Sequence, residues 1–428
     1  MKKILIVQPH EYYLFNYLVT LVPTLIKNNF EVSIYTTDDV VFKKFYATGV
    51  KVHYFPKHLI YLQKLSDRYL IRPISWLAFY LWSYRNRQLF DVAILPFDNK
   101  LIFLAIKSFI KSCTIHTTVN LVDLNQEVIE YQSHKKHSFV NFFERFLKIS
   151  IAPRFNGKIM KHNFSWYIDK IFGPNVPNHI QGFSGVDLIT VTGEKIKSNL
   201  IKSGLTDLDT SIVVTGNPNY EGFPSFVEQF NKEKKEYFKQ SLGLQGRKNI
   251  FTFFLSPSIF SEVQIKEILL VIARINFTYP DCTLYLKFHP KTVPKYLEIF
   301  EKKLLELKVQ FIISKNFNGD EFNLKLILIS EAIFQKQSTV GFIAMQAKTP
   351  IISYNFFHTG YFDNLYEILD CSMHCKTTSD LDQALLDIKN PTAIEELTSR
   401  QINACNNFCK QTDSPHQEIA LALHAITK

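Results

Sequence analysis

The chain opens with Lys3-Ile-Leu-Ile-Val7 and reaches a similar run at Glu31-Val-Ser-Ile-Tyr35. Between these two runs, residues 12–27 have the apolar spacing of an amphipathic helix, and Asn28-Asn29 marks its end. A short β-type run, a helix and a second short run predict a βαβ unit, in which the two strands are parallel.

The same alternation continues through the first half of the chain. Further strands are expected at residues 50–55, 91–95, 113–119 and 188–191, and helices at residues 101–111 and 195–203. Strands separated by helical stretches imply a parallel sheet that is covered on both faces. Residues 120–181, rich in His, Lys, Phe and Asn, are less regular and are predicted to form helices and long loops near a functional cleft.

A second α/β unit is expected after the strand at residues 211–215. Its charged first helix covers residues 228–242, and its strands are expected at residues 249–255, 283–288, 309–313, 331–334 and 351–354. We therefore predict two doubly wound, Rossmann-like α/β domains facing a central cleft. Residues 1–215 form the first domain, residues 216–400 the second, and terminal helices at 401–428 pack back toward the first.

Composition excludes several classes of protein. The chain has 428 residues, of which 46% are hydrophobic and 21% charged. No apolar run approaches the roughly 20 residues of a membrane-spanning helix, and the apolar run at residues 4–7 is too short for a signal peptide. We therefore expect a cytoplasmic protein.

Six cysteines in a chain of this length suggest a reducing compartment rather than a disulfide scaffold. Two Cys-x3-Cys pairs, Cys371 with Cys375 and Cys405 with Cys409, invite a zinc interpretation, since His374 lies inside the first. That spacing is unusual for zinc, and both pairs lie in segments with helical patterning, where residues i and i+4 share a face. We expect no bound metal.

The positive charge is concentrated in residues 41–111, which contain twelve lysines and arginines against three aspartates. Trp76 and Trp82 lie in the same stretch, and basic residues interleaved with aromatic ones are what an anionic membrane surface attracts. The candidate contacts are the two tryptophans, at the level of the headgroups, and Arg68, Arg72, Arg85 and Arg87. A solvated helix face over a buried aromatic stripe is an equal alternative. Nucleic acid is not expected, because no helix-turn-helix, zinc-finger or RNP-type sequence accompanies the patch.

Polar residues follow three predicted strands of the second domain. Because the carboxyl ends of parallel strands meet at one edge of a sheet, these residues predict a phosphate or pyrophosphate pocket built without a P-loop. Taken one at a time, a histidine here could be a core or capping residue, and a serine a helix N-cap. The residues concerned are Ser256, Ser258, Lys287, His289, Pro290, Lys291, Lys336, Ser338 and Thr339.

Two of these strand ends resemble a known superfamily. Residues 284–290 (LYLKFHP) and 338–350 (STVGFIAMQAKTP) are similar to the HP and S-S/T motifs of GT-B enzymes of bacterial polysaccharide synthesis. These enzymes are sialyltransferases and polysialyltransferases, Kdo transferases and CDP-glycerol glycerophosphotransferases. More loosely, residues 190–204 and 213–220 look like the end of the first domain and the interdomain crossover in this superfamily, which includes UDP-GlcNAc 2-epimerases.

The resemblance implies that His289 binds the donor phosphate and stabilises the leaving nucleotide, while Ser338 and Thr339 add hydroxyl donors and Lys287 or Lys291 adds charge. It implies no metal cofactor. Asp207-Leu-Asp209 and Asp380-Leu-Asp382 have the form of a metal-binding Asp-x-Asp motif, but we interpret both as incidental. Many uridine-nucleotide enzymes of the superfamily carry a glutamate after the serine motif, where this chain has Phe-Ile-Ala at 342–344. This departure favours a cytidine-activated donor.

The acceptor hydroxyl needs a base from the first domain. Glu11 follows the first predicted strand, and Asp98 lies in a loop similar to one that carries an aspartate in the epimerases. A water-poor cleft would raise the pKa of either carboxyl toward a useful range, although each could equally be a helix N-cap. His10, Asp123, Glu127 and Glu130 are further candidates.

Together these observations predict a metal-independent glycosyltransferase. It would move a sugar from a CMP- or CDP-linked donor, such as a nonulosonate or Kdo, to a bacterial cell-surface glycan of capsule or lipopolysaccharide. The expected partners are the nucleotide-sugar donor, a glycan or lipid-linked glycan acceptor, and the inner face of an anionic membrane. The alternatives are an epimerase, which would turn over donor without acceptor, and a non-catalytic nucleotide-sugar-binding protein.

Overall fold

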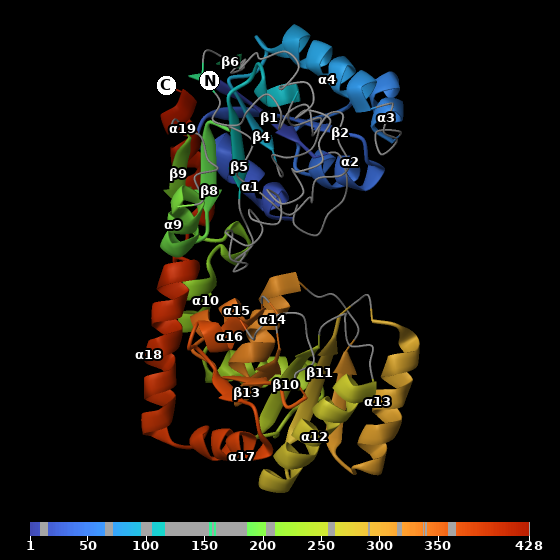
Figure 1. Cartoon of the computed structure of the whole chain (residues 1–428), viewed down its shortest axis with the longest axis vertical. Coiled ribbons are helices and arrows are strands. Elements are labelled where there is room, and N and C mark those ends of the chain that lie inside the picture. The colour runs from blue at the N-terminus through green and yellow to red at the C-terminus, as the bar shows by residue number, and fades with distance from the viewer. Residues whose placement is uncertain are drawn as a thin grey trace, which may run out of the picture. The chain divides into compact units, whose positions relative to one another are not determined.

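The chain forms two compact units in a computed structural model (Figure 1). One unit comprises Met1–Glu221 together with Ser414–Lys428, and the other comprises Gly222–Asp413. The structure describes residues 1–8, 16–64, 72–95, 105–115, 154–155, 158–159, 186–202, 210–255, 262–289, 292–314, 319–336, 338, 340–357 and 365–427.

The first unit contains a seven-stranded sheet of parallel strands in the order β3-β2-β1-β4-β5-β8-β9. The strands are β1 (Lys2–Val7), β2 (Phe30–Thr36), β3 (Lys51–Tyr54), β4 (Val92–Leu95), β5 (Ser112–Ile115), β8 (Leu188–Val191) and β9 (Ser211–Val214). Alternate residues of β1 enter different cores, because Ile4 and Ile6 pack on one face and Leu5 and Val7 on the other. The predicted parallel sheet with two covered faces is confirmed.

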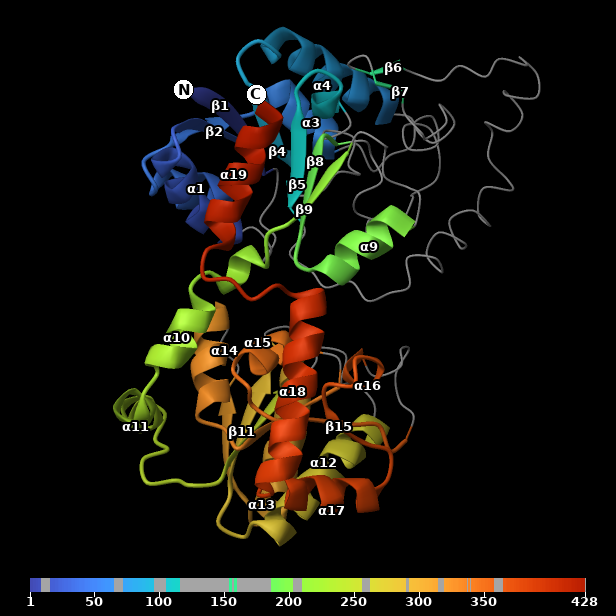
Figure 2. The same ribbon diagram turned by 90° about the vertical axis from the view of Figure 1, so that its left-hand side faces the viewer.

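Helices cover both faces of this sheet. On one face α1 (Asn16–Lys27) packs beside α19 (Pro415–Thr427), and Leu21 and Leu423 share one core (Figure 2). On the other face α3 (Lys57–Lys64) packs against α4 (Arg72–Asn86), and Phe79 joins a second core. Other elements among the described residues are α2 (Asp39–Tyr46), α9 (Glu194–Lys202), the 3₁₀ turn η3 (Pro218–Tyr220) and the short antiparallel pair β6 (Arg154–Phe155) and β7 (Lys158–Ile159).

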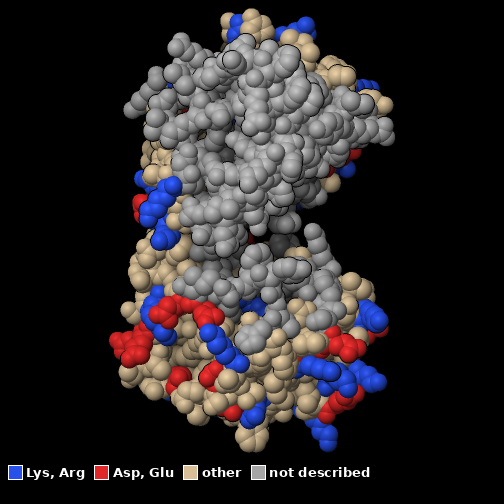
Figure 3. Space-filling model, in the orientation of Figure 1, with Lys and Arg blue, Asp and Glu red and all other residues tan. Residues whose placement is uncertain are grey.

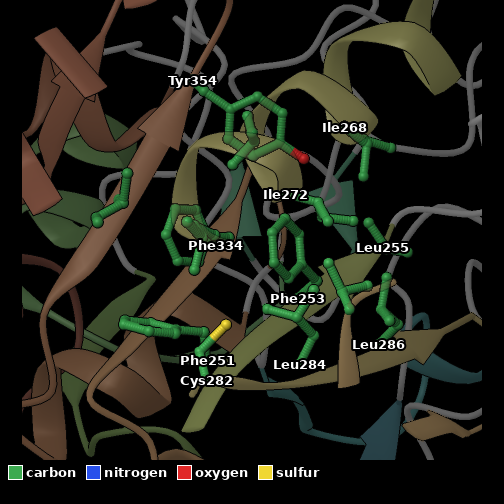
Figure 4. Close-up of a cluster of buried hydrophobic side chains, with 14 of the residues drawn as sticks. Phe251, Phe253, Leu255, Ile268, Ile272, Cys282, Leu284, Leu286, Phe334 and Tyr354 are labelled. Carbon is green, nitrogen blue, oxygen red and sulfur yellow. The ribbon is translucent and has the colours of Figure 1, made fainter. Parts of the chain in front are cut away.

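The second unit contains a six-stranded parallel sheet in the order β12-β11-β10-β13-β14-β15. The strands are β10 (Ile250–Leu255), β11 (Thr283–Phe288), β12 (Gln310–Ser314), β13 (Ala332–Gln335), β14 (Ile351–Tyr354) and β15 (Met373–Cys375). Figure 4 shows part of its core, where the rings of Phe253 and Phe334 stack with centroids 4.7 Å apart. Numbered along the unit, this is the strand order 3-2-1-4-5-6 of the Rossmann sheet.

The helices of the second unit are α10 (Phe223–Gln229), α11 (Lys232–Ser241), α12 (Glu262–Thr278), α13 (Pro294–Glu306), α14 (Gly319–Leu328), α15 (Val340–Gln346), α16 (Leu365–Ile368), α17 (Thr378–Asp387) and α18 (Pro391–Phe408). The prediction of one charged helix at 228–242 is wrong, because the segment divides at Phe230-Asn231. The Asn231 side chain accepts a hydrogen bond from Lys234 N and caps the start of α11. The helical interpretation of Cys371 to Cys375 is also wrong, because residues 373–375 pair with β14.

The chain passes between the units twice, after Glu221 and after Asp413. The two crossings are tied within the second unit, where Gly222 N donates to Asp413 O at 3.0 Å and the Asp413 carboxylate accepts from Ser225 N and Oγ. The sequence predicted the first boundary at 215 and the start of the terminal helices at 401. In the structure α18 packs on α15 and stays with the second unit, whereas α19 completes the first. None of the helices in the described ranges has the length and apolarity needed to cross a bilayer.

Candidate functional site

The strand order of the second unit locates a binding edge. From β10 the chain winds outward through β11 and β12, and from β13 it winds the opposite way through β14 and β15. The winding therefore reverses between β10 and β13, and ligands of such sheets lie beyond the carboxyl ends of the strands at that reversal. The strands end within one residue of one another, because Leu255 pairs with Phe288 and Phe253 pairs with Phe334, one residue before the end of β13.

Two of the three predicted strand ends flank this edge. His289 follows β11 directly, and Ser338 lies shortly after β13. Since β10 separates these strands, their ends are about 10 Å apart, twice the spacing between neighbouring strands. The sheet therefore brings His289 and Ser338 to either side of the β10 end. Ser256, Ser258, Pro290, Lys291 and Thr339 lie outside the described residues.

Ser338 begins a tightly built turn. Its Oγ accepts a hydrogen bond from Val340 N at 3.3 Å, so the N-cap role anticipated for it is present. Its carbonyl accepts from Gly341 N at 3.1 Å and from the Tyr366 hydroxyl. A Cβ on Gly341 would collide with the Gln335 amide and the Tyr366 ring, so this position requires glycine. This requirement explains the glycine in the motif.

Lys287 and His289 occupy the end of β11. The half-buried His289 accepts a hydrogen bond from Thr292 N at its carbonyl, 2.9 Å away. Lys287 is only 9% exposed, and its Nζ lies 4.7 Å from the centroid of the Phe322 ring. Burial lowers the pKa of Lys287 to about 8, although nearby Asp320 partly opposes the shift. Burial in turn raises the pKa of the Asp320 carboxyl.

A buried ion pair that the sequence did not predict stabilises the same edge. Glu267 of α12 is fully buried; its carboxylate pairs with Lys336 Nζ and accepts a hydrogen bond from Phe357 N at 3.3 Å. Lys336 Nζ also lies 5.5 Å from the centroid of the Tyr354 ring. One carboxylate thus ties the ends of β13 and β14 to α12. The sequence does contain one signal for this ion pair, because Glu267 lies next to Ile268 in a largely apolar helix.

The first unit has a corresponding edge between β1 and β4, where its winding also reverses. Ile6 pairs with Ile94, so the two strands end level with one another. Glu11 lies four residues beyond β1 and Asp98 three beyond β4, and both lie outside the described residues. The same is true of His10, Asp123, Glu127 and Glu130. The assignment of the base therefore stays a prediction, but both leading candidates follow strands that meet at the reversal.

The second Asp-x-Asp sequence has structural partners. Asp380 accepts hydrogen bonds from the backbone of Thr377 and Lys376 in a capping box at the start of α17, and these bonds lower its pKa. Asp382 pairs with Arg274 at 3.2 Å. Asp207 and Asp209 lie outside the described residues.

The cysteines and His374 are likewise engaged in packing. All six thiols are buried, and none of them forms a disulfide. His374 contacts Glu367 through Nε2 at 2.9 Å and Ser353 through Nδ1 at 3.0 Å, and burial is the main cause of its lowered pKa. Within the described ranges, no group of three or more His, Cys, Asp or Glu side chains is placed to hold a metal ion.

No family model matches the sequence, and no curated protein matches it. Solved structures, in contrast, match the whole chain. A glycosyltransferase from Rickettsia africae is 13% identical with a TM-score of 0.59, covering 100% of this chain and 99% of its own. A UDP-GlcNAc 2-epimerase from Neisseria meningitidis bound to UDP-GlcNAc is 13% identical with a TM-score of 0.58, covering 99% of this chain and 100% of its own.

WaaG, a glycosyltransferase involved in lipopolysaccharide biosynthesis, is 11% identical with a TM-score of 0.52, covering 97% of this chain and 98% of its own. Identities this low carry information about the fold alone. The two parallel α/β sheets and the full-length likeness to these enzymes confirm the predicted pair of doubly wound α/β domains, and the chain has the GT-B fold.

Proposed function

We propose that this protein is a glycosyltransferase that moves a sugar from a nucleotide-activated donor to an acceptor hydroxyl. The observation that carries the proposal is the placement of His289 and Ser338 on either side of the β10 end, where the winding of the second sheet reverses. Lys287 and Lys336 bring two cationic side chains to the ends of the same two strands. This chemistry suits a phosphate-containing ligand.

In the proposed reaction the acceptor oxygen bonds to the anomeric carbon of the sugar while the bond from that carbon to the donor phosphate breaks. Negative charge then develops on the departing nucleotide. His289 and the hydroxyls of Ser338 and Thr339 would donate hydrogen bonds to this charge from fixed positions, with Lys287 adding positive charge. Glu11 or Asp98 of the first unit would accept the proton of the acceptor hydroxyl. The chain's own residues therefore supply the stabilisation that a metal ion provides elsewhere.

We assign a cytidine-activated donor, CMP- or CDP-linked, such as a nonulosonate or Kdo. The reason is the missing carboxylate after the serine motif, where Phe342, Ile343 and Ala344 are all buried apolar residues of α15. A uridine nucleotide is the rival, supported by the Neisseria epimerase structure, which contains UDP-GlcNAc. The acceptor we propose is a bacterial cell-surface glycan, in line with the role stated for WaaG.

The second candidate is a sugar-nucleotide epimerase. It is favoured by the Neisseria structure, whose TM-score of 0.58 almost equals that of the Rickettsia glycosyltransferase. An epimerase would convert its sugar nucleotide in the absence of any acceptor, whereas a transferase would need one.

The test begins with thermal unfolding of the protein in the presence of CMP-, CDP-, UDP-, GDP- and TDP-linked sugars. A donor present at 100 times its dissociation constant stabilises the folded state by about 2.7 kcal/mol. We expect the largest shift with a cytidine-linked sugar, and a lost shift in His289→Ala but not in His58→Ala, which changes an exposed histidine of the first unit.

The donor that binds is then incubated with and without glycan acceptors. Transfer that requires acceptor supports the transferase. Conversion of donor alone to an isomeric sugar nucleotide would establish the epimerase instead, and a shift with UDP-sugars only would overturn the cytidine assignment. If no sugar nucleotide stabilises the protein, the proposed function is wrong.

A further inference from the structure

Helix α4 exposes an apolar stripe. Its outer residues Ile74, Leu77, Leu81 and Tyr84 are 58%, 49%, 48% and 47% exposed. Their spacing places them on one face of the helix. The opposite face is also largely apolar, because Phe79 is buried in the core of the first unit. The helix is thus hydrophobic on two sides, and only one of them covers the core of its own unit.

The tryptophans lie on the inner side of α4. The Trp82 ring packs edge-on against Tyr35 and Phe55, with centroids 5.1 and 5.0 Å away, and Trp76 packs partly buried against the same core. Of the two alternatives that the sequence left open, tryptophans at the lipid headgroups or a buried aromatic stripe, the structure has the second for the tryptophans. Trp76 and Trp82 pack against the core, whereas Leu77 and Leu81 between them face outward.

The surroundings of the stripe are cationic. Helices α3 and α4 pack against one another, and neither α3 nor residues 72–90 contain an aspartate or glutamate. Arg85 is exposed near the end of α4, and the Arg87 guanidinium lies 3.7 Å from the centroid of the Tyr84 ring. At the upper margin of Figure 3, where Figure 1 draws α4, the coloured atoms are tan or blue.

We propose that the α3–α4 face binds an anionic lipid bilayer surface. The residues of the stripe enter the boundary between headgroups and acyl chains, while Arg85 and Arg87 contact anionic headgroups. The outer apolar face of α4 is stabilised when it is buried in an apolar environment such as the acyl chains of a bilayer. Since neither helix has an acidic residue, no side chain of α3 or α4 repels anionic lipid. This inference concerns the first unit and holds whichever nucleotide the second unit binds.

The first experiment measures co-sedimentation of the full chain with vesicles of phosphatidylcholine alone or mixed with phosphatidylglycerol. We expect binding to the anionic vesicles that weakens as salt rises. Leu77→Ser with Leu81→Ser should weaken it about tenfold, and Arg85→Gln with Arg87→Gln by a similar factor. The matched control changes Leu305 and Leu386 to Ser, since these leucines of the second unit are 65% and 61% exposed. The control should bind as the wild type does.

A second measurement gives a signal that a destabilised variant cannot imitate. All six native thiols are buried, so Leu77→Cys and Leu386→Cys each add one accessible site for an environment-sensitive dye. With anionic vesicles the dye at position 77 should shift to shorter wavelength, and the dye at position 386 should not.

Three outcomes would overturn the proposal. The first is wild-type protein that does not bind anionic vesicles at low salt, and the second is a dye at position 77 whose emission does not shift. The third is a double arginine variant that loses vesicle binding while the double leucine variant keeps it. In the third case, if a soluble anionic polysaccharide displaces the protein from the vesicles, the α3–α4 face binds an anionic glycan instead of lipid.

Discussion

His289 carries the sharpest prediction at the scale of single residues. His289→Ala should leave the fold intact, because this half-buried side chain is not part of the hydrophobic core. A fixed donor to a leaving phosphate contributes roughly 2 to 4 kcal/mol in the transition state, so kcat/KM should fall about 30- to 1000-fold. Initial rates with saturating acceptor are the measurement, and His58→Ala is the control. Near-normal turnover would remove His289 from the site.

Lys287 should lower the unfolding free energy of the protein while its positive charge favours donor binding. Its pKa of about 8 in the folded protein lies below the value near 10.5 of the unfolded chain, so folding disfavours its charged form. This cost is fully present below pH 8 and is relieved as pH rises from about 8 toward 10.5. Lys287→Met should therefore stabilise the protein at pH 7 by about 1 to 2 kcal/mol, less than the full shift implies because solvent still reaches the ammonium.

The measurement is denaturant unfolding of both proteins at pH 7 and pH 10, where the difference between them should shrink. If Lys287 assists the donor, wild-type affinity should also fall as pH rises through 8, and Lys287→Met should lack that dependence. A variant that is less stable than the wild type at pH 7 would contradict the assigned burial cost.

The sequence predicted the roles of residues whose partners are close in the chain, and it missed an interaction between residues that are far apart in the chain. His289 and Ser338 were identified from motifs a few residues long, and the capping roles of Ser338 and Asp380 involve neighbours in the chain. Glu267 and Lys336 are 69 positions apart, and only the folded sheet brings them together. Glu11 and Asp98 stay predictions.

Among the elements, α12 is joined to the ends of β13 and β14 through Glu267. Removing one partner of a buried pair costs about 3 to 5 kcal/mol because a charge is left without compensation. Glu267→Gln should destabilise the second unit by about 2 to 3 kcal/mol, since Lys336 keeps 23% side-chain exposure, and should weaken donor binding. The control, Glu262→Gln, changes an exposed acid of the same helix.

Chemical denaturation of the double variant Glu267→Gln with Lys336→Met completes the test. Removing both charges should recover part of the lost stability, whereas additive losses would mean that the two side chains act independently.

Helix α19 completes the core of the first unit and should be indispensable to it. Leu423 is fully buried, so Leu423→Ala should cost about 2 to 5 kcal/mol of unfolding free energy. Leu421 is 56% exposed on the same helix, and Leu421→Ala should change stability by about 0.5 kcal/mol or less. Backbone amide hydrogen exchange in β1 and β2 should be faster in Leu423→Ala than in Leu421→Ala. Equal exchange rates in these two variants would contradict the packing of α19 described above.

Elements with strong periodicity were predictable, and those set by tertiary contacts were not. The alternation of apolar runs and helices gave every strand of the second sheet except β15, whose three residues become a strand only by pairing with β14. The division of the charged segment into α10 and α11 depends on Asn231, whose capping role competes with the helical pattern around it.

For the molecule as a whole, the proposed chemistry predicts activity without a metal ion. If His289, Ser338 and Thr339 stabilise the leaving nucleotide, EDTA should leave initial rates within about twofold of the untreated enzyme. Rates measured before and after chelation, with Mn²⁺ and Mg²⁺ added back, provide the check. Activity abolished by EDTA and restored by either ion would direct attention to Asp207 and Asp209, which lie outside the described residues.

The two crossings of the chain have a consequence for biosynthesis. The first unit needs α19, yet residues 222–413 are translated between its last strand and that helix. At about 5 to 20 residues per second, a ribosome needs roughly 10 to 40 seconds to make that insertion. Throughout this interval the surface that Ile419 and Leu423 will cover has no partner from α19. Newly made protein should therefore depend on chaperones during this interval, and the second unit, which is continuous in sequence, can fold first.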